Sequence, residues 1–253
     1  MAMTDAAPSP IPAATLVVMR QGEDGAAPDL LFVERSRDLR FAGGAVVFPG
    51  GRIDPGDHAL AERIAPGLSD AAARIAAIRE TLEETGLAVG FATSPPPEAA
   101  ARMRRGLNDG RAMGEVIEGA LDLDALVPFA RWRPDLPHAR VFDTLFYLAR
   151  CPACMGEVSV DGTENSRLFW ARAQRVLDDA ARGDVHIIYP TRRNLERLAA
   201  RADFDAAIAH ARDFPVRLIT PWVEMRDGAR HLCIPDDLGY PVTSEPLADV
   251  KRG

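Results

Sequence analysis

Strand-like and helix-like segments follow one another irregularly along this 253-residue chain, and their order limits the fold more than any other feature. Strands are expected at 14–20, 30–36, 43–51, 125–132, 140–150 and 168–170. Helices are expected at 70–85, 98–120 (interrupted near 106–110), 171–182 and 191–202. This order lacks the steady alternation of a doubly wound sheet, so the sequence predicts an α+β fold with a mixed sheet.

The domain organisation follows from the length and the loop signals. A chain of 253 residues suits one large domain or two small ones. Residues 1–12 are expected to form a disordered lead and residues 13–253 a single domain. Insertions are expected at about 58–70 and 96–122, with a C-terminal extension from about 204.

Composition excludes several classes of function. The net charge of −7 disfavours a general nucleic-acid binder, although bound metal would still permit a polyanionic small molecule. No apolar run approaches the roughly 20 residues that span a bilayer, so no membrane partner is expected. The N-terminus lacks the pattern of a secretory signal, and three cysteines are too few for a disulfide scaffold. These features predict a cytoplasmic, reduced protein.

The helix expected at 70–85 carries three glutamates on one face. At about 100° per residue, the apolar and acidic side chains fall on opposite faces. The apolar face has Ile75, Ile78 and Leu82, and the acidic face has Glu80, Glu83 and Glu84. Such a cluster repels itself unless a hard divalent cation binds it. The alternative is an ordinary solvated acidic face.

Residues 50–87 resemble the box of the Nudix hydrolase family, G-x5-E-x7-R-E-U-x-E-E-x-G-U, with U a bulky apolar residue. The matching residues are Gly51, Arg79, Glu80, Glu83, Glu84, Gly86 and Leu87. Thr81 stands at an apolar position and Asp57 at the first glutamate. Residues 58–78 number 21 where the pattern has 7, an insertion resembling the larger coenzyme A diphosphatase-like subgroup. The resemblance implies an α/β/α sandwich with a helical insertion.

A second stretch, from Arg35 to Asp54, resembles the coenzyme A-associated signature of some Nudix enzymes. The matching residues are Arg35, Ser36, Arg40, Gly44, Phe48, Pro49, Gly50, Gly51 and Asp54, whereas Phe32 and Val33 depart from it. Guanidinium groups pair well with phosphate oxygens, so Arg35 and Arg40 are expected to contact phosphates. Alternatively, they pair with local acids such as Glu34 or Asp38.

The resemblance implies a metal-dependent pyrophosphohydrolase. The Gly50 carbonyl, Glu80, Glu83 and Glu84 would bind Mg²⁺ or Mn²⁺, and Glu80 would act as the base or orient the water. Arg79 would fix a carboxylate rotamer, while Arg35, Arg40 and Gly51 would bind substrate. Glu164 is expected to add a metal ligand, or else to be a surface residue, and Asp143 is a weaker candidate because it lies inside an apolar segment.

The implied partner is a small molecule with a pyrophosphate, and a homodimer is possible. Coenzyme A or acyl-coenzyme A would give phosphopantetheine (or its acyl form) and adenosine 3′,5′-bisphosphate. The alternative substrates are NADH, ADP-ribose or a nucleotide sugar. A non-catalytic nucleotide sensor is a further alternative, but sensors commonly lose box carboxylates and all three glutamates are present here.

Three other groups of residues have two interpretations each. Cys151 and Cys154 suggest free thiols or, with Cys233 and His231, structural zinc. Trp132, Trp170 and Trp222 are expected to pack in the interior rather than to stack on adenine. Tyr189, Arg192 and Arg193 suggest either a solvated helix start or a contribution to substrate recognition.

Overall fold

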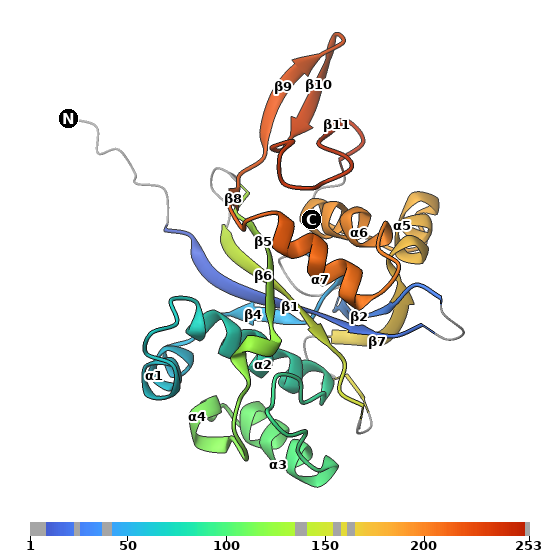
Figure 1. Cartoon of the computed structure of the whole chain (residues 1–253). Helices are drawn as coiled ribbons and strands as arrows, with labels where there is room; N and C mark the ends of the chain where they lie inside the picture. Colours follow the sequence, from blue (N-terminus) through green and yellow to red (C-terminus); the bar gives the residue numbers. More distant parts are fainter. Residues whose placement is uncertain are drawn as a thin grey trace, which may run out of the picture.

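The protein is built around one mixed β-sheet with helices on both faces (Figure 1). The computed structural model describes residues 9–22, 26–36, 42–134, 141–153, 158–160 and 165–250. The main-sheet strands are β1 Ile11–Arg20, β2 Asp29–Arg35, β3 Val46–Val47, β4 Gly50–Arg52, β5 Val127–Trp132, β6 Phe142–Arg150, β7 Asn165–Arg172 and β8 Leu218–Ile219. This arrangement confirms the predicted α+β class with a mixed sheet.

The order of strands is β3-β2-β1-β6-β5-β8, with β4 also paired to β1 and β7 to β2. The pairs β1–β6 and β5–β8 are parallel, and the other pairs are antiparallel. Alternate residues of β1 enter two separate cores, because successive side chains of a strand point to opposite faces. Val17 and Met19 face one core, and Leu16 and Val18 face the other. The central strand is therefore buried on both faces.

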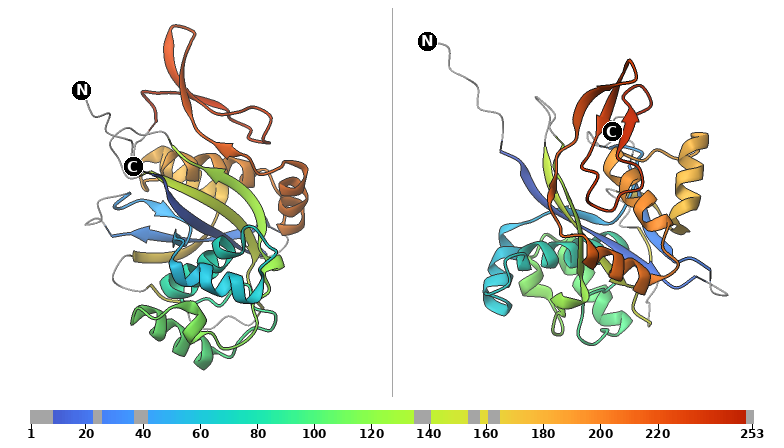
Figure 2. Two further views of the ribbon diagram at one scale, coloured as in Figure 1. Left: turned by 90° about the vertical axis from the view of Figure 1, so that its left-hand side faces the viewer. Right: turned by 45° about the horizontal axis from the view of Figure 1, so that its top comes forward.

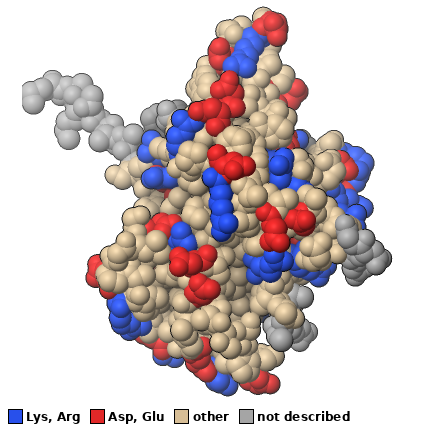
Figure 3. Space-filling model, in the orientation of Figure 1, with Lys and Arg blue, Asp and Glu red and all other residues tan. Residues whose placement is uncertain are grey.

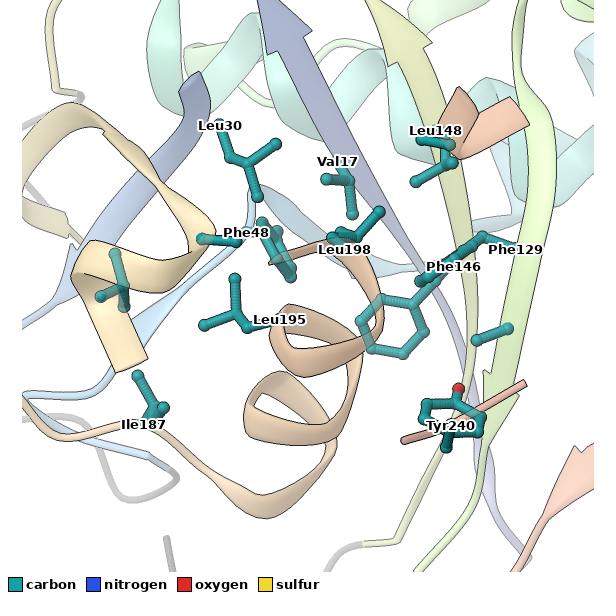
Figure 4. Packing of buried hydrophobic residues seen from close by; sticks show 14 of the residues in the cluster. Val17, Leu30, Phe48, Phe129, Phe146, Leu148, Ile187, Leu195, Leu198 and Tyr240 are labelled. Atoms are coloured by element: carbon teal, nitrogen blue, oxygen red, sulfur yellow. The ribbon is translucent and has the colours of Figure 1, made fainter. Parts of the chain in front are cut away.

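The first core lies beneath the C-terminal helices. These helices are α5 Ala173–Arg182, α6 Tyr189–Ala199 and α7 Phe204–Asp213. Figure 4 shows Leu195 and Leu198 of α6 against Val17, Leu30 and Phe48. Burial of this large apolar set is the main driving force that holds the helical layer on the sheet.

The second core lies beneath the helices between β4 and β5. These elements are α1 Pro55–Ile64, α2 Ala71–Thr85, α3 Pro97–Asn108, α4 Met113–Val116 and the short 3₁₀ helix η2 Leu123–Ala125. Helix α1, which the sequence analysis did not assign, begins before the first predicted insertion and extends into it. The second insertion forms α3 and α4, and the break between them at residues 109–112 overlaps the interruption predicted near 106–110.

The C-terminal extension belongs partly to the main fold and partly to a separate small sheet. Helix α7 packs in the first core, and β8 adds an edge strand beside β5. The strands β9 Trp222–Arg226, β10 Ala229–Cys233 and β11 Ser244–Pro246 then form a three-stranded sheet. Its β9–β10 hairpin projects away from the body in every view (Figures 1 and 2).

Several sequence predictions need correction. Strand β1 begins at Ile11, so the lead ends earlier than residue 12 because residues 11 and 12 pair with β6. The strand expected at 43–51 is split into β3 and β4, which pair with different neighbours. Trp222 is 43% exposed and is not an interior residue. Among the described residues, no helix has the length and apolarity needed to cross a bilayer.

Candidate active site

Helix α2 carries the acidic cluster and is fixed by its apolar face. Ile75, Ile78 and Leu82 are fully buried in the second core, as the helical spacing predicts. Asp70 is the N-cap residue, although its side chain accepts a hydrogen bond from Arg74 rather than from the helix backbone. Gly86 ends the helix with φ of 76°, a left-handed conformation that glycine adopts without a steric penalty.

The acidic face of α2 is packed against protein and is not a solvated surface. Only 5% of Glu84 is exposed, and the Glu80 and Glu83 side chains are 16% and 31% exposed. The solvated-face interpretation is therefore wrong for Glu80 and Glu84. Buried carboxylates are rare unless they are paired or bind a cation, so this packing needs a functional explanation.

Strand β4 is packed closely against β1 at Gly50 and against the Glu80 side chain of α2 at Gly51. A side chain at Gly50 would place its Cβ 2.5 Å from the Ala14 carbonyl oxygen, and one at Gly51 would collide with the Glu80 carboxylate. The Gly50 N–H donates to Glu84 Oε2 at 3.2 Å. The backbone of β4 thus lies against the acidic residues, with the Gly50 N–H directed at Glu84.

Arg79 connects the acidic residues of the site. Its guanidinium donates to Asp57 at 2.9 Å, to Glu80 at 2.8 Å and to Glu83 at 3.4 Å. It also donates to the Arg52 carbonyl at 2.9 Å. Burial alone lowers the pKa of Arg79, but Asp57 and Glu80 outweigh this effect and raise it. Arg79 therefore stays charged and holds the carboxylates in place.

The structure gives Asp57 a role despite the long insertion that follows it. Asp57 is 1% exposed, and both of its carboxylate oxygens accept hydrogen bonds from Arg79. Asp57 Oδ2 also accepts from the Asp54 N–H at 2.9 Å, which fixes the first turn of α1. The insertion does not break this contact. Asp57 lies in the first turn of α1, before the insertion, and Arg79 lies in α2, after it.

Two glutamates share an environment that disfavours their ionised forms. Burial, followed by the charge of Glu83, raises the pKa of Glu80 to about 7 against the opposing effect of Arg79. Burial and the charge of Glu80 raise the pKa of Glu84 to about 8. Both shifts describe the protein without metal. The ionised pair therefore destabilises the metal-free fold and would be stabilised by a bound cation.

Replacing Glu84 should stabilise the metal-free protein. A carboxyl with a raised folded-state pKa contributes stability that is complete below its unfolded value of 4.5 and is lost as pH rises through about 8. In EDTA, Glu84→Gln should therefore melt above the wild type at pH 8 by about 3 °C or more, and the difference should shrink toward pH 5. Calorimetry at several pH values checks this. The exposed Glu98→Gln is the control, and an equal gain there would contradict the assignment.

Arg35 and Asn165 also lie beside Glu84. Each of these side chains lowers the pKa of Glu84, Asn165 by a hydrogen bond and Arg35 by its charge. Arg35 Nε is buried without a hydrogen-bond partner among the described residues. Glu34, which the sequence suggested as a partner of Arg35, forms an ion pair with Arg167 instead. Arg40, Asp38 and Glu164 lie outside the described residues.

Arg104 of α3 is a residue that the sequence analysis missed. Its guanidinium donates to the backbone carbonyls of Glu83 at 2.9 Å and Glu84 at 3.2 Å. It also donates to the Ser159 hydroxyl and carbonyl, while the Ser159 N–H donates to the Thr85 carbonyl. Arg104 therefore fastens the second insertion to the end of α2. Helix α3 carries three arginines, and nothing in the sequence distinguishes Arg104 from Arg102 and Arg105.

Loss of Arg104 should loosen the last turn of α2. Arg104→Met keeps most of the side-chain volume but removes the hydrogen bonds to the Glu83 and Glu84 carbonyls. We expect amide exchange in the last turn of α2 to accelerate roughly tenfold, because charged donors stabilise such carbonyls strongly. Hydrogen–deuterium exchange checks this, with the exposed Arg102→Met as the matched control. Unchanged protection would show that Arg104 does not hold the helix.

The site has the donor type that a hard divalent cation requires, but the described side chains do not form a complete metal cage. Glu80, Glu83 and Glu84 supply carboxylate oxygens on one side of α2, and Mg²⁺ and Mn²⁺ prefer oxygen ligands. Within the described ranges, no three His, Cys, Asp or Glu side chains are grouped so that they could hold a metal ion. Glu80 and Glu83 are instead directed at Arg79.

The remaining candidates lie apart from this site. Asp143 on β6, the weaker candidate for an added metal ligand, forms an ion pair with Arg131 at 2.7 Å. Arg193 is 2% exposed and pairs with Glu196 and Glu245, so this part of the start of α6 is not solvated. Trp132 packs in the first core, as predicted.

The cysteine and surface-charge expectations have separate outcomes. Cys233 is a buried free cysteine, Cys151 is partly exposed, and Cys154 lies outside the described residues. No zinc ligand set is found in the part of the chain that the structure describes. On the face shown in Figure 3, acidic and basic side chains are interspersed without a continuous basic surface.

Comparisons with known proteins agree with the fold. No protein-family model matches the chain. Over 181 residues it is 26% identical to a Caenorhabditis elegans protein with the name nudix hydrolase 7, an alignment that covers 70% of this chain and 57% of the relative. The chain thus spans little more than half the length of that relative. A NUDIX hydrolase crystal structure from Alicyclobacillus acidocaldarius superposes with a TM-score of 0.65 at 29% identity, covering 79% of this chain and 96% of that one.

Proposed function

The chain belongs to the Nudix hydrolase family, and we propose that it is a metal-dependent pyrophosphohydrolase. The observation that carries the proposal is the packing of the Glu80 and Glu84 carboxylates against β4, with Arg79 paired to Asp57 behind them. A fold that holds carboxylates where their ionised forms are disfavoured loses stability near neutral pH, as the raised pKa values of Glu80 and Glu84 indicate. Binding of a cation and a phosphate-rich substrate at this position accounts for that loss.

Each residue of the acidic site has a proposed role in binding the cation or in positioning the reacting groups. The carboxylates of Glu80, Glu83 and Glu84 and the carbonyl of Gly50 would hold Mg²⁺ or Mn²⁺. A bound divalent cation would neutralise pyrophosphate charge and lower the pKa of a bound water. Glu80 would accept a proton from the attacking water or orient it. Arg79 touches Glu80 and Glu83 and acts as the residue that positions them.

Two further residues complete the proposal. Arg35, with its buried and unpartnered Nε beside Glu84, would pair with a phosphate oxygen. Glu164 remains a predicted ligand from the sequence. It immediately precedes Asn165, which contacts Glu84, and it follows Ser159, which bonds the end of α2. Ser159 and Asn165, which precede and follow Glu164 in the sequence, thus both lie at the C-terminal end of α2.

For the substrate we propose coenzyme A or an acyl derivative. Water would add across the pyrophosphate to give phosphopantetheine (or its acyl form) and adenosine 3′,5′-bisphosphate. The support is the stretch from Arg35 to Asp54, which resembles the coenzyme A-associated signature and contains both Arg35 and the β4 glycines. The pyrophosphate chemistry rests on the acidic site and is independent of this choice.

A substrate panel tests the proposal. The protein is incubated with Mg²⁺ or Mn²⁺ and coenzyme A, acetyl-coenzyme A, NADH, ADP-ribose or a nucleotide sugar, and products are identified by mass spectrometry. Release of adenosine 3′,5′-bisphosphate that stops in EDTA is the expected result. Cleavage of another member would retain the reaction and discard the substrate. Tight binding of a ligand without cleavage of any would indicate a sensor and overturn the proposed activity.

A further inference from the structure

The β9–β10 hairpin presents an unpaired edge with exposed apolar side chains. Strand β9 pairs with β10 on one side, and no described strand pairs with its other side. Three of its five residues are large and exposed: Trp222 at 43%, Val223 at 45% and Met225 at 63%. The hairpin projects from the body, so this edge is accessible (Figures 1 and 2). Exposed apolar edge strands are templates for pairing with another strand.

We propose that β9 pairs antiparallel with β9 of a second copy of this chain, across a twofold axis at Met225. The hairpin turn defines which backbone groups are available. Asp227 and Gly228 have φ of 50° and 78°, the signature of a two-residue type I′ turn. In such a hairpin the flanking pair, Arg226 and Ala229, exchanges hydrogen bonds. By alternation along the strand, the N–H and C=O groups of Val223 and Met225 point to the open edge.

Charge then selects one pairing among those that the backbone allows. With Met225 opposite itself, Glu224 of each copy lies opposite Arg226 of the other, which is favourable. A shift that places Glu224 opposite itself brings like charges together. Within one chain Glu224 already accepts from Arg226 at 3.1 Å, so the paired strands would carry a row of alternating charges on this face.

The opposite face of the paired strands becomes an apolar row. Val223 and Met225 share this face because they are two residues apart in a strand. In the proposed register, the Met225 side chains of the two copies meet at the axis and both Val223 side chains flank them. The exposed Val223 and Met225 side chains are thereby covered, whereas Trp222 lies on the charged face beside Glu224. A five-residue ladder buries less than a standard interface, so we expect a concentration-dependent dimer.

Sedimentation velocity on the full chain over a wide concentration range tests the surface. The wild type should shift from monomer toward dimer, and Met225→Lys should raise the dimer dissociation constant by at least about tenfold. Ile64→Lys is the matched control, because Ile64 is an exposed apolar residue (44%) on α1. A protein that is monomeric throughout, or a dimer that survives Met225→Lys with the wild-type constant, would overturn the proposal.

Engineered cysteines test the register without relying on affinity. Opposed residues in a hydrogen-bonded antiparallel pair have Cα atoms about 5.5 Å apart, within disulfide range. Met225→Cys should therefore form a disulfide-linked dimer on oxidation. Val223→Cys should not, because its two copies would lie about 13 Å apart along the strands. Crosslinking by Val223→Cys and not by Met225→Cys would place the axis elsewhere and refute this register.

Discussion

Glu83→Gln is expected to abolish turnover while leaving the protein folded. Glu83 is the most exposed of the three glutamates, so the amide should cause little structural damage. The substitution removes a negative charge where cation binding is proposed, and losses of this kind reduce kcat by about 10³-fold. The KM should change much less, because the lost interaction acts mainly on the transition state. Steady-state kinetics with the substrate found in the panel provides the measurement.

The control for this experiment is Glu98→Gln. Glu98 is also a helical glutamate, but it is exposed at the start of α3, away from the acidic site. It should retain wild-type kcat and KM. If Glu83→Gln retained more than a tenth of the wild-type kcat, the acidic face of α2 would not be the catalytic centre.

Arg79→Met is expected to give the largest loss of stability. Arg79 is 7% exposed, and Asp57 beside it is 1% exposed. Removal of the guanidinium leaves the Asp57 charge buried without its main partner, and breaking a buried pair in this way costs about 3–5 kcal/mol. For a protein of this size, Tm should fall by roughly 10 °C or more. Thermal unfolding followed by circular dichroism gives the value.

A second substitution separates this effect from lost packing. Adding Asp57→Asn to Arg79→Met removes the stranded charge, so the double variant should melt above the single one. The exposed pair of Arg102 and Glu118 is the comparison, and Arg102→Met should stay near the wild-type Tm. Equal Tm values for Arg79→Met and Arg102→Met would contradict the role of Arg79 as the centre of the site.

Many helices and strands could be predicted because the residues that determine them are close together in the sequence. Helix α2 has apolar residues at helical spacing and a glycine stop, and both features could be found before the structure. Strand β1 extends beyond its predicted start because pairing with β6 continues to Ile11, a tertiary effect. Helix α1 was not predicted because most of its short segment was interpreted as part of the insertion in the box. Trp222 was misplaced because an exposed tryptophan on a projecting hairpin has the same local sequence signal as a buried one.

The acidic residues of the site were predictable, and their supports were only partly so. The box spacing identified Glu80, Glu83, Glu84 and Arg79, but could not show that Glu84 is buried and Glu80 mostly covered by protein. The partner of Arg79 across the insertion depends on how α1 folds back, which spacing alone does not give. Arg104 reaches α2 from a separate helix, and such contacts depend on tertiary packing.

The most direct test of the central claim is Mn²⁺ binding to the dialysed protein, measured by electron paramagnetic resonance. The account predicts at least one Mn²⁺ per chain, with binding lost or weakened at least about tenfold in Glu83→Gln and unchanged in Glu98→Gln. The measurement does not depend on the choice of substrate. If the wild type bound no Mn²⁺, or if Glu83→Gln bound it as tightly, the acidic face of α2 would not be a metal site, and the proposed mechanism would fail.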